Sequence, residues 1–377
     1  MKNVFIVGAR GYKENYGGWE TFVTSLVDNY NDSDTHFYIT NISDNCNSIK
    51  CINDNITVIS IKTKNCGSAR MFLYTLLAYK RVINYINENK LSNCYIYVLG
   101  LKLGFYMNIK KNYLRKKGII TIVNPDGLEW KRSKWSYPVK KFFLMSEKWM
   151  LNACDIIVCD AKGIKEYVDS NYPKCSSKTH YIAYGSEDIN ISDISHGDVL
   201  SEYGLKEYDY CLMVGRCVPE NNYELVINDF MKSNINKKLV IISNLDSSDY
   251  SLKLKSIADK DERIIFINGV YDKVKLSIIR KYAFLYIHGH SVGGTNPSLL
   301  EALRYTDINV LYDVNFNHDI GLDSCLYFKN DGDLTSILDD YVNVDKDRNK
   351  MSKKAKKIIN DNYTWNIIAD KYKKIFK

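Results

Sequence analysis

The sequence predicts an α/β fold made of two doubly wound domains, each with a parallel sheet covered by helices on both faces. Three observations support this prediction. The chain has 377 residues, which is more than a single hydrophobic core usually serves. Short apolar runs alternate with longer helical patterns, as they do in β-α-β units. The alternation also stops at one polar stretch and then begins again, which indicates a second domain of the same class.

The first domain is predicted to begin with the strand Val4–Gly8, after which Gly17 and Gly18 open a helix that runs to about Tyr30. Its other strands are short apolar runs bounded by polar or turn residues. They cover His36–Thr40, Ile56–Ile61, Tyr95–Leu99, Ile119–Val123 and Asp155–Cys159. Helices with one apolar face are expected at Ala69–Asn89, Val139–Asn152 and Ala161–Asn171.

The second domain repeats the same alternation. Its strands are expected at Tyr210–Val214, Leu239–Ser243, Ile264–Ile267, Phe284–His288 and Asn309–Tyr312. The polar stretch Glu187–Gly204 has no clear period, and we interpret it as the linker. The domains are therefore placed at residues 1–190 and 205–360. The lysine-rich stretch from Asp345 to Lys357 is interpreted as a solvated helical face.

Composition narrows the class of protein. Hydrophobic residues make up 45% and charged residues 25% of the chain, as in ordinary soluble proteins. The N-terminal apolar run is too short for a signal peptide, and no stretch has the roughly 18 apolar residues of a spanning helix. A cytoplasmic location is therefore expected. The ten cysteines form no CxxC pair and are expected to be reduced core thiols. The formal charge of +8 allows an anionic partner.

The strongest candidate site is the stretch His288–Leu303, HGHSVGGTNPSLLEAL. A buried strand is expected to end at its two histidines, and a helix is expected to begin at Pro297 with Asn296 as its N-cap. The glycine pair before that helix lets backbone N–H groups approach a phosphate or diphosphate, which the helix dipole also favours. Glu301 lies just over one turn into the helix, where a carboxylate can accept two sugar hydroxyls. A plain strand–loop–helix joint is the alternative.

Other candidate motifs also follow strand ends. Asn124-Pro125-Asp126-Gly127 follows a strand of the first domain, and Gly215-Arg216 follows the first strand of the second. Open α/β sheets bind ligands at the carboxyl ends of their strands, so the site is expected in the cleft between the domains. Asp126 is then either a ligand contact or a turn aspartate that bonds its own backbone. The segment Gly8–Gly18 lacks GxGxxG, which argues against a nicotinamide enzyme.

Six segments, which span nearly the whole chain in order, match one known pattern. They are YGGWETFV at Tyr16–Val23, NPDGLEWKRSKW at Asn124–Trp135, YGSE at Tyr184–Glu187, VGRCVPENN at Val214–Asn222, HGHSVGGTNPSLLEAL at His288–Leu303 and YTWNIIADKY at Tyr363–Tyr372. With these segments the chain resembles GT-B glycosyltransferases of family 4. More narrowly, it resembles the bacterial rhamnosyltransferases that build capsular and cell-wall polysaccharides. The Asn124 and His288 segments are the specific ones.

The resemblance implies a fold and a reaction. The fold would be two Rossmann-like domains facing across a cleft, with residues 361–377 forming a helix that returns to the first domain. The reaction would move a sugar from a nucleoside-diphosphate donor with retention at the anomeric carbon, by front-face transfer. Neither a metal nor a cofactor is expected, because cationic side chains, glycine-loop amides and helix N-termini stabilise the leaving diphosphate.

The resemblance also implies roles for residues of the second domain. Arg216 would bind the diphosphate, with a plain surface arginine as the alternative. Asn221 is also assigned to the donor site. The family has a lysine about five residues after the arginine, where this chain has Glu220, Asn221 and Asn222. The amides of Gly293, Gly294, Thr295 and Asn296 would therefore carry more of the stabilisation. Glu301 matches the family glutamate that holds the nucleotide ribose. The family's other glutamate would fall at Gly293, and its loss suggests a donor without a 6-hydroxyl, such as dTDP-L-rhamnose.

For the acceptor side, Asp126 and Glu129 are assigned to the acceptor hydroxyl or the donor sugar. For Glu129 an ion pair with Arg132 is the alternative. Gly17 and Gly18 are assigned to the donor site. His290 is assigned to catalysis, with His288 left open as the alternative. No carboxylate can be assigned as a covalent nucleophile.

Basic and aromatic residues are mixed in Phe105–Lys117 and Trp130–Phe143. Such a mixture is typical of an anionic membrane surface, and a solvated helix face is the alternative. A nucleic-acid partner is not expected. The predicted function is transfer of L-rhamnose to a polyprenyl-diphosphate-linked saccharide at the inner face of the plasma membrane. A transferase of UDP-hexose or UDP-N-acetylhexosamine, or a non-catalytic sugar-nucleotide-binding scaffold, is the alternative.

Overall fold

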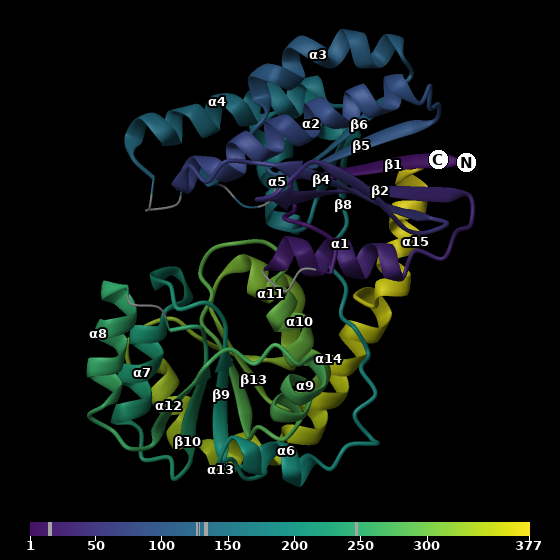
Figure 1. Cartoon of the computed structure of the whole chain (residues 1–377). Coiled ribbons are helices and arrows are strands. Elements are labelled where there is room, and N and C mark those ends of the chain that lie inside the picture. The colour runs from purple at the N-terminus through teal and green to yellow at the C-terminus, as the bar shows by residue number, and fades with distance from the viewer. Residues whose placement is uncertain (14–16, 126, 128, 132–134, 246–247) are drawn as a thin grey trace. The chain divides into compact units, whose positions relative to one another are not determined.

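The chain folds into two α/β units (Figure 1). The first has a mostly parallel sheet and the second a fully parallel one, and each unit has its own hydrophobic core residues. The computed structural model describes residues 1–13, 17–125, 127, 129–131, 135–245 and 248–377. The first unit contains residues 1–185 and 365–377, and the second contains residues 186–364. The predicted fold class, with two doubly wound sheets, is confirmed.

The sheet of the first unit has eight strands in the order β3-β4-β2-β1-β5-β6-β7-β8. All neighbours are parallel except β3, which is antiparallel to β4 at the edge of the sheet. The strands are β1 (Lys2–Val7), β2 (Thr35–Ser43), β3 (Ser48–Asn53), β4 (Ile56–Lys62), β5 (Cys94–Leu99), β6 (Ile120–Asn124), β7 (Ile156–Cys159) and β8 (Thr179–Tyr181).

Helices cover both faces of this sheet. They are α1 (Gly18–Asp28), α2 (Arg70–Glu88), α3 (Gly104–Lys116), α4 (Tyr137–Ala153), α5 (Lys162–Asn171) and α15 (Trp365–Ile375), with short 3-10 turns at Gly67–Ala69, Glu129–Lys131 and Pro173–Lys178. Side chains alternate along a strand, and β5 shows the result. Ile96 and Val98 join the core under α2 to α5. Tyr95 and Tyr97 instead contact Phe376, Tyr372 and Phe22 on the opposite face.

The C-terminal helix α15 belongs to the first unit. The hydroxyls of Tyr97 and Tyr372 lie 2.8 Å apart, and Tyr95 donates a hydrogen bond to the carbonyl of Lys377. Trp365 lies directly over Gly185, where a Cβ would come within 2.5 Å of the indole ring. Any larger residue at position 185 would therefore displace Trp365, which explains the glycine in the YGSE segment.

The sheet of the second unit has six parallel strands in the order β11-β10-β9-β12-β13-β14. The strands are β9 (Tyr210–Val214), β10 (Lys238–Ile242), β11 (Ile264–Ile267), β12 (Leu285–His288), β13 (Asn309–Tyr312) and β14 (Leu326–Phe328). Helices α7 (Tyr223–Lys232), α8 (Asp249–Ala258) and α12 (Asp333–Asp339) share one core. Helices α6 (His196–Glu202), α9 (Lys273–Lys281) and α10 (Pro297–Tyr305) share the other.

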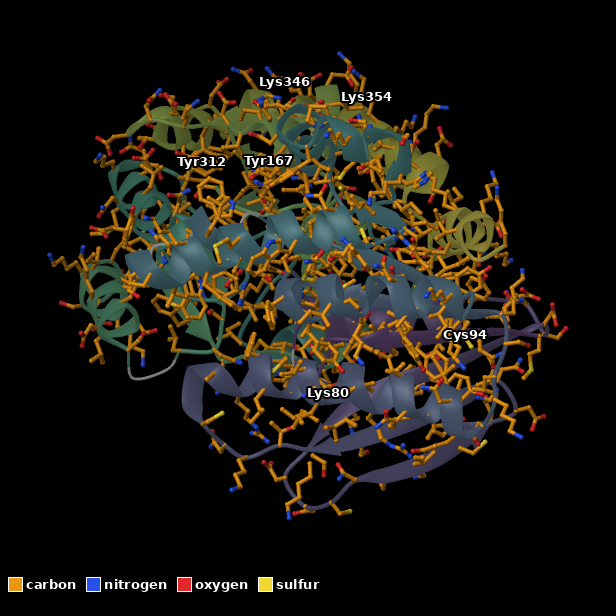
Figure 2. All side chains as sticks on the ribbon, turned by 90° about the horizontal axis from the view of Figure 1, so that it is seen from above. Lys80, Cys94, Tyr167, Tyr312, Lys346 and Lys354 are labelled. Atoms are coloured by element: carbon orange, nitrogen blue, oxygen red, sulfur yellow. The ribbon has the colours of Figure 1, made fainter. Side chains whose placement is uncertain are left out.

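The remaining helices of the second unit are α11 (Asn315–Gly321), α13 (Tyr341–Lys346) and α14 (Arg348–Asn362), with 3-10 turns at Pro219–Asn221 and Leu322–Ser324. The lysine-rich stretch from Asp345 to Lys357 contains the end of α13 and most of α14. Its lysines lie at the surface, as Figure 2 shows for Lys346 and Lys354. The stretch expected to be a linker, Glu187–Gly204, lies within the second unit and contains α6. The prediction of a linker relied on the polar composition of this stretch. One of its polar residues, Ser195, is instead the N-cap of α6.

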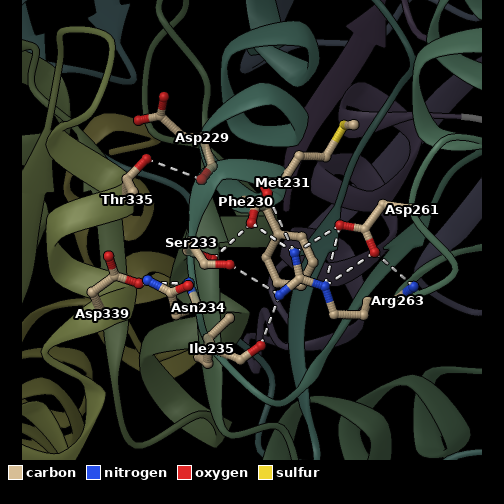
Figure 3. A network of polar contacts seen from close by, with 10 residues as sticks. All are labelled: Asp229, Phe230, Met231, Ser233, Asn234, Ile235, Asp261, Arg263, Thr335 and Asp339. Atoms are coloured by element: carbon tan, nitrogen blue, oxygen red, sulfur yellow. Dashed lines mark hydrogen bonds and ion pairs between the residues drawn. The ribbon is translucent and has the colours of Figure 1, made fainter.

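A network around Arg263 fixes the C-terminal end of α7 (Figure 3). The Arg263 guanidinium donates hydrogen bonds to the carbonyls of Ser233 at 3.0 Å and Ile235 at 2.9 Å, and it pairs with Asp261 at 2.7 Å. It also lies 4.8 Å from the centroid of the Phe230 ring. Its Nη2 also donates to the carbonyls of Phe230 at 3.4 Å and Met231 at 3.5 Å in the last turn of α7, where a cation complements the helix dipole.

All ten cysteines carry free thiols, as expected. The prediction that they are core residues is wrong for Cys46, Cys51 and Cys66, which are exposed. Cys51 lies on β3, every residue of which is exposed. None of the helices in the described part of the chain has the length and hydropathy needed to cross a bilayer.

Candidate functional site

The carboxyl ends of β9 and β12 form the centre of the candidate site in the second unit. The two strands are neighbours, so the loops that follow them meet at one edge of the sheet. Asn222 donates a hydrogen bond from Nδ2 to the carbonyl of Gly289 at 2.8 Å. In return, the backbone N–H of Ser291 donates to the carbonyl of Glu220 at 2.9 Å. These bonds join the loop that follows β9, which contains Arg216, to the loop that follows β12, which contains His290.

Within the first of these loops, Asn221 acts on the backbone. Its buried side chain donates from Nδ2 to the carbonyl of Arg216 at 2.8 Å and closes the turn. Its own carbonyl lies so close to Gly289 that a Cβ there would approach within 2.2 Å. Asn221 therefore shapes the loop, and the Arg216 side chain stays exposed to solvent.

The two histidines after β12 stack on each other with ring centroids 4.2 Å apart and planes at 8°. His288 is fully buried, and its Nε2 has no hydrogen-bond partner among the described residues. Burial, and then the neighbouring His290, hold the pKa of His288 well below its ordinary value. Burial, and then the charge of Arg216, lower the pKa of His290 to about 3. Both rings are therefore neutral near pH 7.

His290 also lies against the other loop. A Cβ at Gly215 would come within 3.0 Å of His290 Cε1, so glycine there allows the imidazole to approach the backbone next to Arg216. The Nδ1 of His290 has no hydrogen-bond partner within the part of the chain that the structure describes. The ring thus offers a neutral donor or acceptor beside the Arg216 loop.

The N-terminus of α10 completes this edge of the unit. Gly293 has a φ of 138°, which strains any residue with a Cβ. No atom of the described residues lies within 4 Å of the position that a Cβ would take. Asn296 is the N-cap, as predicted, and its side chain accepts a hydrogen bond from the N–H of Ser298 at 2.9 Å. Ser298 donates from Oγ to the carbonyl of Val214 at 3.3 Å, which brings the first turn of α10 to the end of β9.

Glu301 has a partner that the sequence did not reveal. Its Oε2 lies 2.7 Å from Nη2 of Arg280, whose side chain is 3% exposed, while that of Glu301 is 34% exposed. Nη2 of Arg280 also donates to Oγ of Ser298 at 3.2 Å. In the second unit the structure thus brings together Arg216, His290, the turn from Gly293 to Asn296 and Glu301, and it adds Arg280.

In the first unit, Gly17 and Gly18 lie at the exposed start of α1. The backbone of Gly17 is extended, a conformation that any residue can adopt. A Cβ there would come within 3.0 Å of Oε2 of Glu20. The buried Glu20 was not predicted. Its Oε1 accepts a hydrogen bond from the N–H of Arg10 at 2.8 Å.

Asp126 lies outside the described residues, and so does Arg132, the alternative partner of Glu129. Glu129 begins a 3-10 turn and accepts a hydrogen bond from Nε1 of Trp135 at 2.9 Å. Its carboxylate is therefore held by an aromatic residue of its own motif. Among the described residues, no three His, Cys, Asp or Glu side chains are grouped so that they would hold a metal ion.

Comparison with known proteins supports the fold. Residues 1–187 match a family described as "Domain of unknown function (DUF1972)". No curated protein matches the sequence. Sucrose-phosphate synthase from Thermosynechococcus elongatus is a similar solved structure, with a TM-score of 0.80 and 13% identity over 100% of this chain and 98% of the other.

Two further similar structures carry nucleotides. The catalytic domain of starch synthase IV from Arabidopsis thaliana, bound to ADP and acarbose, has a TM-score of 0.74 and 11% identity over 100% of this chain and 98% of the other. HepE from Anabaena, in complex with UDP, has a TM-score of 0.72 and 11% identity over 100% and 99%. At such identities the likeness concerns the fold, and the fold of this chain is GT-B, with two Rossmann-like domains.

Proposed function

We propose that the chain is a glycosyltransferase that takes a sugar from a nucleoside-diphosphate donor bound by the second unit. One observation carries the proposal: Arg216, His290 and the N-terminus of α10 meet at the joined ends of β9 and β12. Parallel α/β sheets bind ligands at this edge. The ADP and UDP in the two similar structures support the same assignment.

The chemistry of this edge suits a departing diphosphate. The leaving group gains negative charge in the transition state, and fixed dipoles and cations that face it lower the barrier. The exposed guanidinium of Arg216 supplies a charge. The open space at Gly293 lets a phosphate approach the N–H groups at the start of α10. His290 would add a neutral hydrogen bond to the donor.

The finer proposal is a retaining transfer of L-rhamnose from dTDP-L-rhamnose to a polyprenyl-diphosphate-linked saccharide. Gly293 supports the choice of a 6-deoxy sugar, because the chain has no acidic side chain where related glycosyltransferases hold the donor sugar. Glu301 would hold the ribose of the donor nucleotide. Front-face transfer would let the leaving phosphate oxygen take the acceptor proton, so the protein would supply alignment and electrostatics.

A lipid-linked acceptor would require contact with the bilayer, and α3 and α4 offer a surface for it. The two helices pack side by side (Figure 1). Phe105 on α3 is 64% exposed and Tyr137 on α4 is 69% exposed. Lys110 and Lys141 lie over tyrosine rings of the same helices. Apolar tips with lysines beside them favour the interface of an anionic membrane, so we place the enzyme peripherally on the inner face of the plasma membrane.

Thermal unfolding with UDP, dTDP, ADP and GDP, followed by transfer assays with the matching sugar donors, tests the proposal. A ligand at about 100 times its Kd stabilises by about 2.7 kcal/mol. Stabilisation by dTDP and transfer from dTDP-L-rhamnose are expected. Transfer from a UDP-hexose alone would correct the donor. Nucleotide binding with neither transfer nor donor hydrolysis would indicate a scaffold, and no nucleotide binding at all would refute the proposal.

A further inference from the structure

The loop that follows β12 is held from both sides by side chains of the neighbouring loops. β12 lies between β9 and β13 in the sheet. On the side of β9, Asn222 donates a hydrogen bond to the carbonyl of Gly289 at 2.8 Å. On the side of β13, Asn317 donates from Nδ2 to the carbonyl of His290 at 3.1 Å. Two asparagine amides therefore fix the carbonyls of two consecutive residues of this loop.

Asn317 is tied to the sheet as well as to this loop. It lies on α11, its side chain is fully buried, and its Nδ2 also donates to the carbonyl of Tyr312 at 2.8 Å. Tyr312 is the last residue of β13. An amide nitrogen has two protons, and these two bonds use both of them. One side chain thus connects the end of β13 to the main chain of His290.

The two carbonyl partners also fix the orientation of the Asn317 amide. A flipped amide would point its oxygen at both carbonyls and could donate to neither. In the observed orientation Oδ1 is buried and has no hydrogen-bond partner among the described residues. An unpaired buried acceptor is destabilising. It is tolerated here because Nδ2 has to face the two carbonyls, so this side chain has a single orientation and a single pair of partners.

The place of the His290 ring depends on where its main chain is held. The ring stacks on His288 with centroids 4.2 Å apart, and a Cβ at Gly215 would come within 3.0 Å of its Cε1. The imidazole is therefore fitted between the histidine below it and the backbone of the loop that follows β9. A gap of about 1 Å already removes up to about half of a van der Waals contact, so a shift of the His290 main chain would loosen the ring on both sides.

We propose that Asn317 is a positioning residue, which holds the imidazole of His290 against the loop that follows β9. The inference rests on the proposed function, in which His290 gives a neutral hydrogen bond to the donor. The buried side chain of Asn317 does not itself reach the donor; it acts through the main chain of His290. A group that reacts or binds in one geometry loses its effect when the residues that support it are removed. Loss of Asn317 is therefore expected to resemble loss of the His290 ring.

NMR of protein with ¹³C-labelled histidine tests the positioning directly. Burial and the charge of Arg216 lower the pKa of His290 to about 3, so its Cε1–H signal, assigned with His290→Gln, should not titrate between about pH 5.5 and pH 8 in the parent protein. In Asn317→Leu the ring is expected to move toward solvent, and its signal should titrate in that range. Asn315→Leu is the matched control, because Asn315 is an exposed residue of the same helix. It should keep the parental signal.

Asn317→Ala is the second variant, for the case that leucine does not fit the buried position. It also removes both hydrogen bonds, and it should give the same titrating signal. A folded variant of Asn317 whose His290 signal stays parental would overturn the inference, whatever the protein transfers.

Transfer assays test whether Asn317 acts through His290. Asn317→Leu and His290→Gln are each expected to lower the rate of transfer by about tenfold, and the double variant should match His290→Gln within about threefold. A general structural defect would slow both backgrounds equally. A double variant that is a further tenfold slower, or Asn317→Leu at the parental rate, would overturn the inference and leave the proposed function standing. A parent protein that neither binds a nucleotide nor transfers a sugar would refute both.

Discussion

The coupling between Arg280 and Glu301 gives the sharpest prediction about the second unit. Arg280→Met, Glu301→Gln and the double variant form a mutant cycle that isolates the energy of the pair. Removing one partner of a buried ion pair costs about 3–5 kcal/mol. Here Glu301 is 34% exposed and Ser298 keeps one bond to the guanidinium. Water and the serine therefore compensate in part, and we expect a coupling energy of roughly 1.5–2 kcal/mol.

The assay must report on the second unit. All five tryptophans lie outside residues 186–364, so tryptophan fluorescence follows the first unit alone. Hydrogen exchange of the amides in α9 and α10 is the direct measurement, because it gives a local opening free energy for each variant. Each single variant should lower this free energy, and the double variant should recover most of the loss.

The same experiment contains its own control and its refutation. Fluorescence-detected unfolding of the first unit should be unchanged in all three variants. A coupling energy below about 0.5 kcal/mol, which is the usual range for independent sites, would show that the ion pair is not formed in solution. Glu301→Gln should in addition lower transfer about tenfold, which corresponds to about 1.4 kcal/mol. An unchanged rate and KM would assign Glu301 to structure alone.

Three further predictions follow from the proposed function and its site. Arg216→Ala should weaken dTDP and UDP binding by about 1.5–3 kcal/mol without changing thermal unfolding, and parental affinity would remove Arg216 from the site. The folded pKa of His290 is about 3, below the unfolded value of about 6.5. The unfolded chain therefore binds more protons between these values, so stability should fall as pH decreases from 6.5 toward 3. His290→Gln should flatten that fall, measured by urea unfolding, whereas the exposed His180→Gln control should not; equal slopes would contradict the assignment. Binding to anionic vesicles at low salt should weaken as salt rises and in the variant with Lys140→Ser and Lys141→Ser, and equal sedimentation of parent and variant would contradict membrane docking.

The strands that the sequence predicted are those with apolar residues on both faces. β9 and β10 read as continuous apolar runs because helices cover both sides of the sheet. β3 was missed because it is an edge strand whose residues are all exposed, so burial left no pattern in its sequence. β8 and β14 have three residues each, which is too short for any period to show.

Some residues of the candidate site could be predicted from local sequence rules, and others depend on contacts between distant segments. The cap at Asn296 and the turn at Gly293 follow from local backbone rules, and the sequence predicted both. Arg280 follows from no local rule. It precedes the exposed Lys281 in an ordinary amphipathic helix, and only the packing of α9 against α10 makes it a partner of Glu301. Tertiary contacts of this kind leave no signal in a single sequence.

The charges of the site indicate that Arg216 contributes more to diphosphate binding than its exposed position suggests. Asn221 carries no charge, and its side-chain amide donates a hydrogen bond to the carbonyl of Arg216. The charge of Arg280 is matched by Glu301, and His290 is neutral near pH 7 because burial lowers its pKa. Of these groups in the described part of the second unit, the guanidinium of Arg216 and the dipole at the start of α10 are left to face a diphosphate. Loss of Arg216 therefore leaves a site that relies on backbone N–H groups, and its effect on diphosphate affinity should approach the upper end of the predicted range.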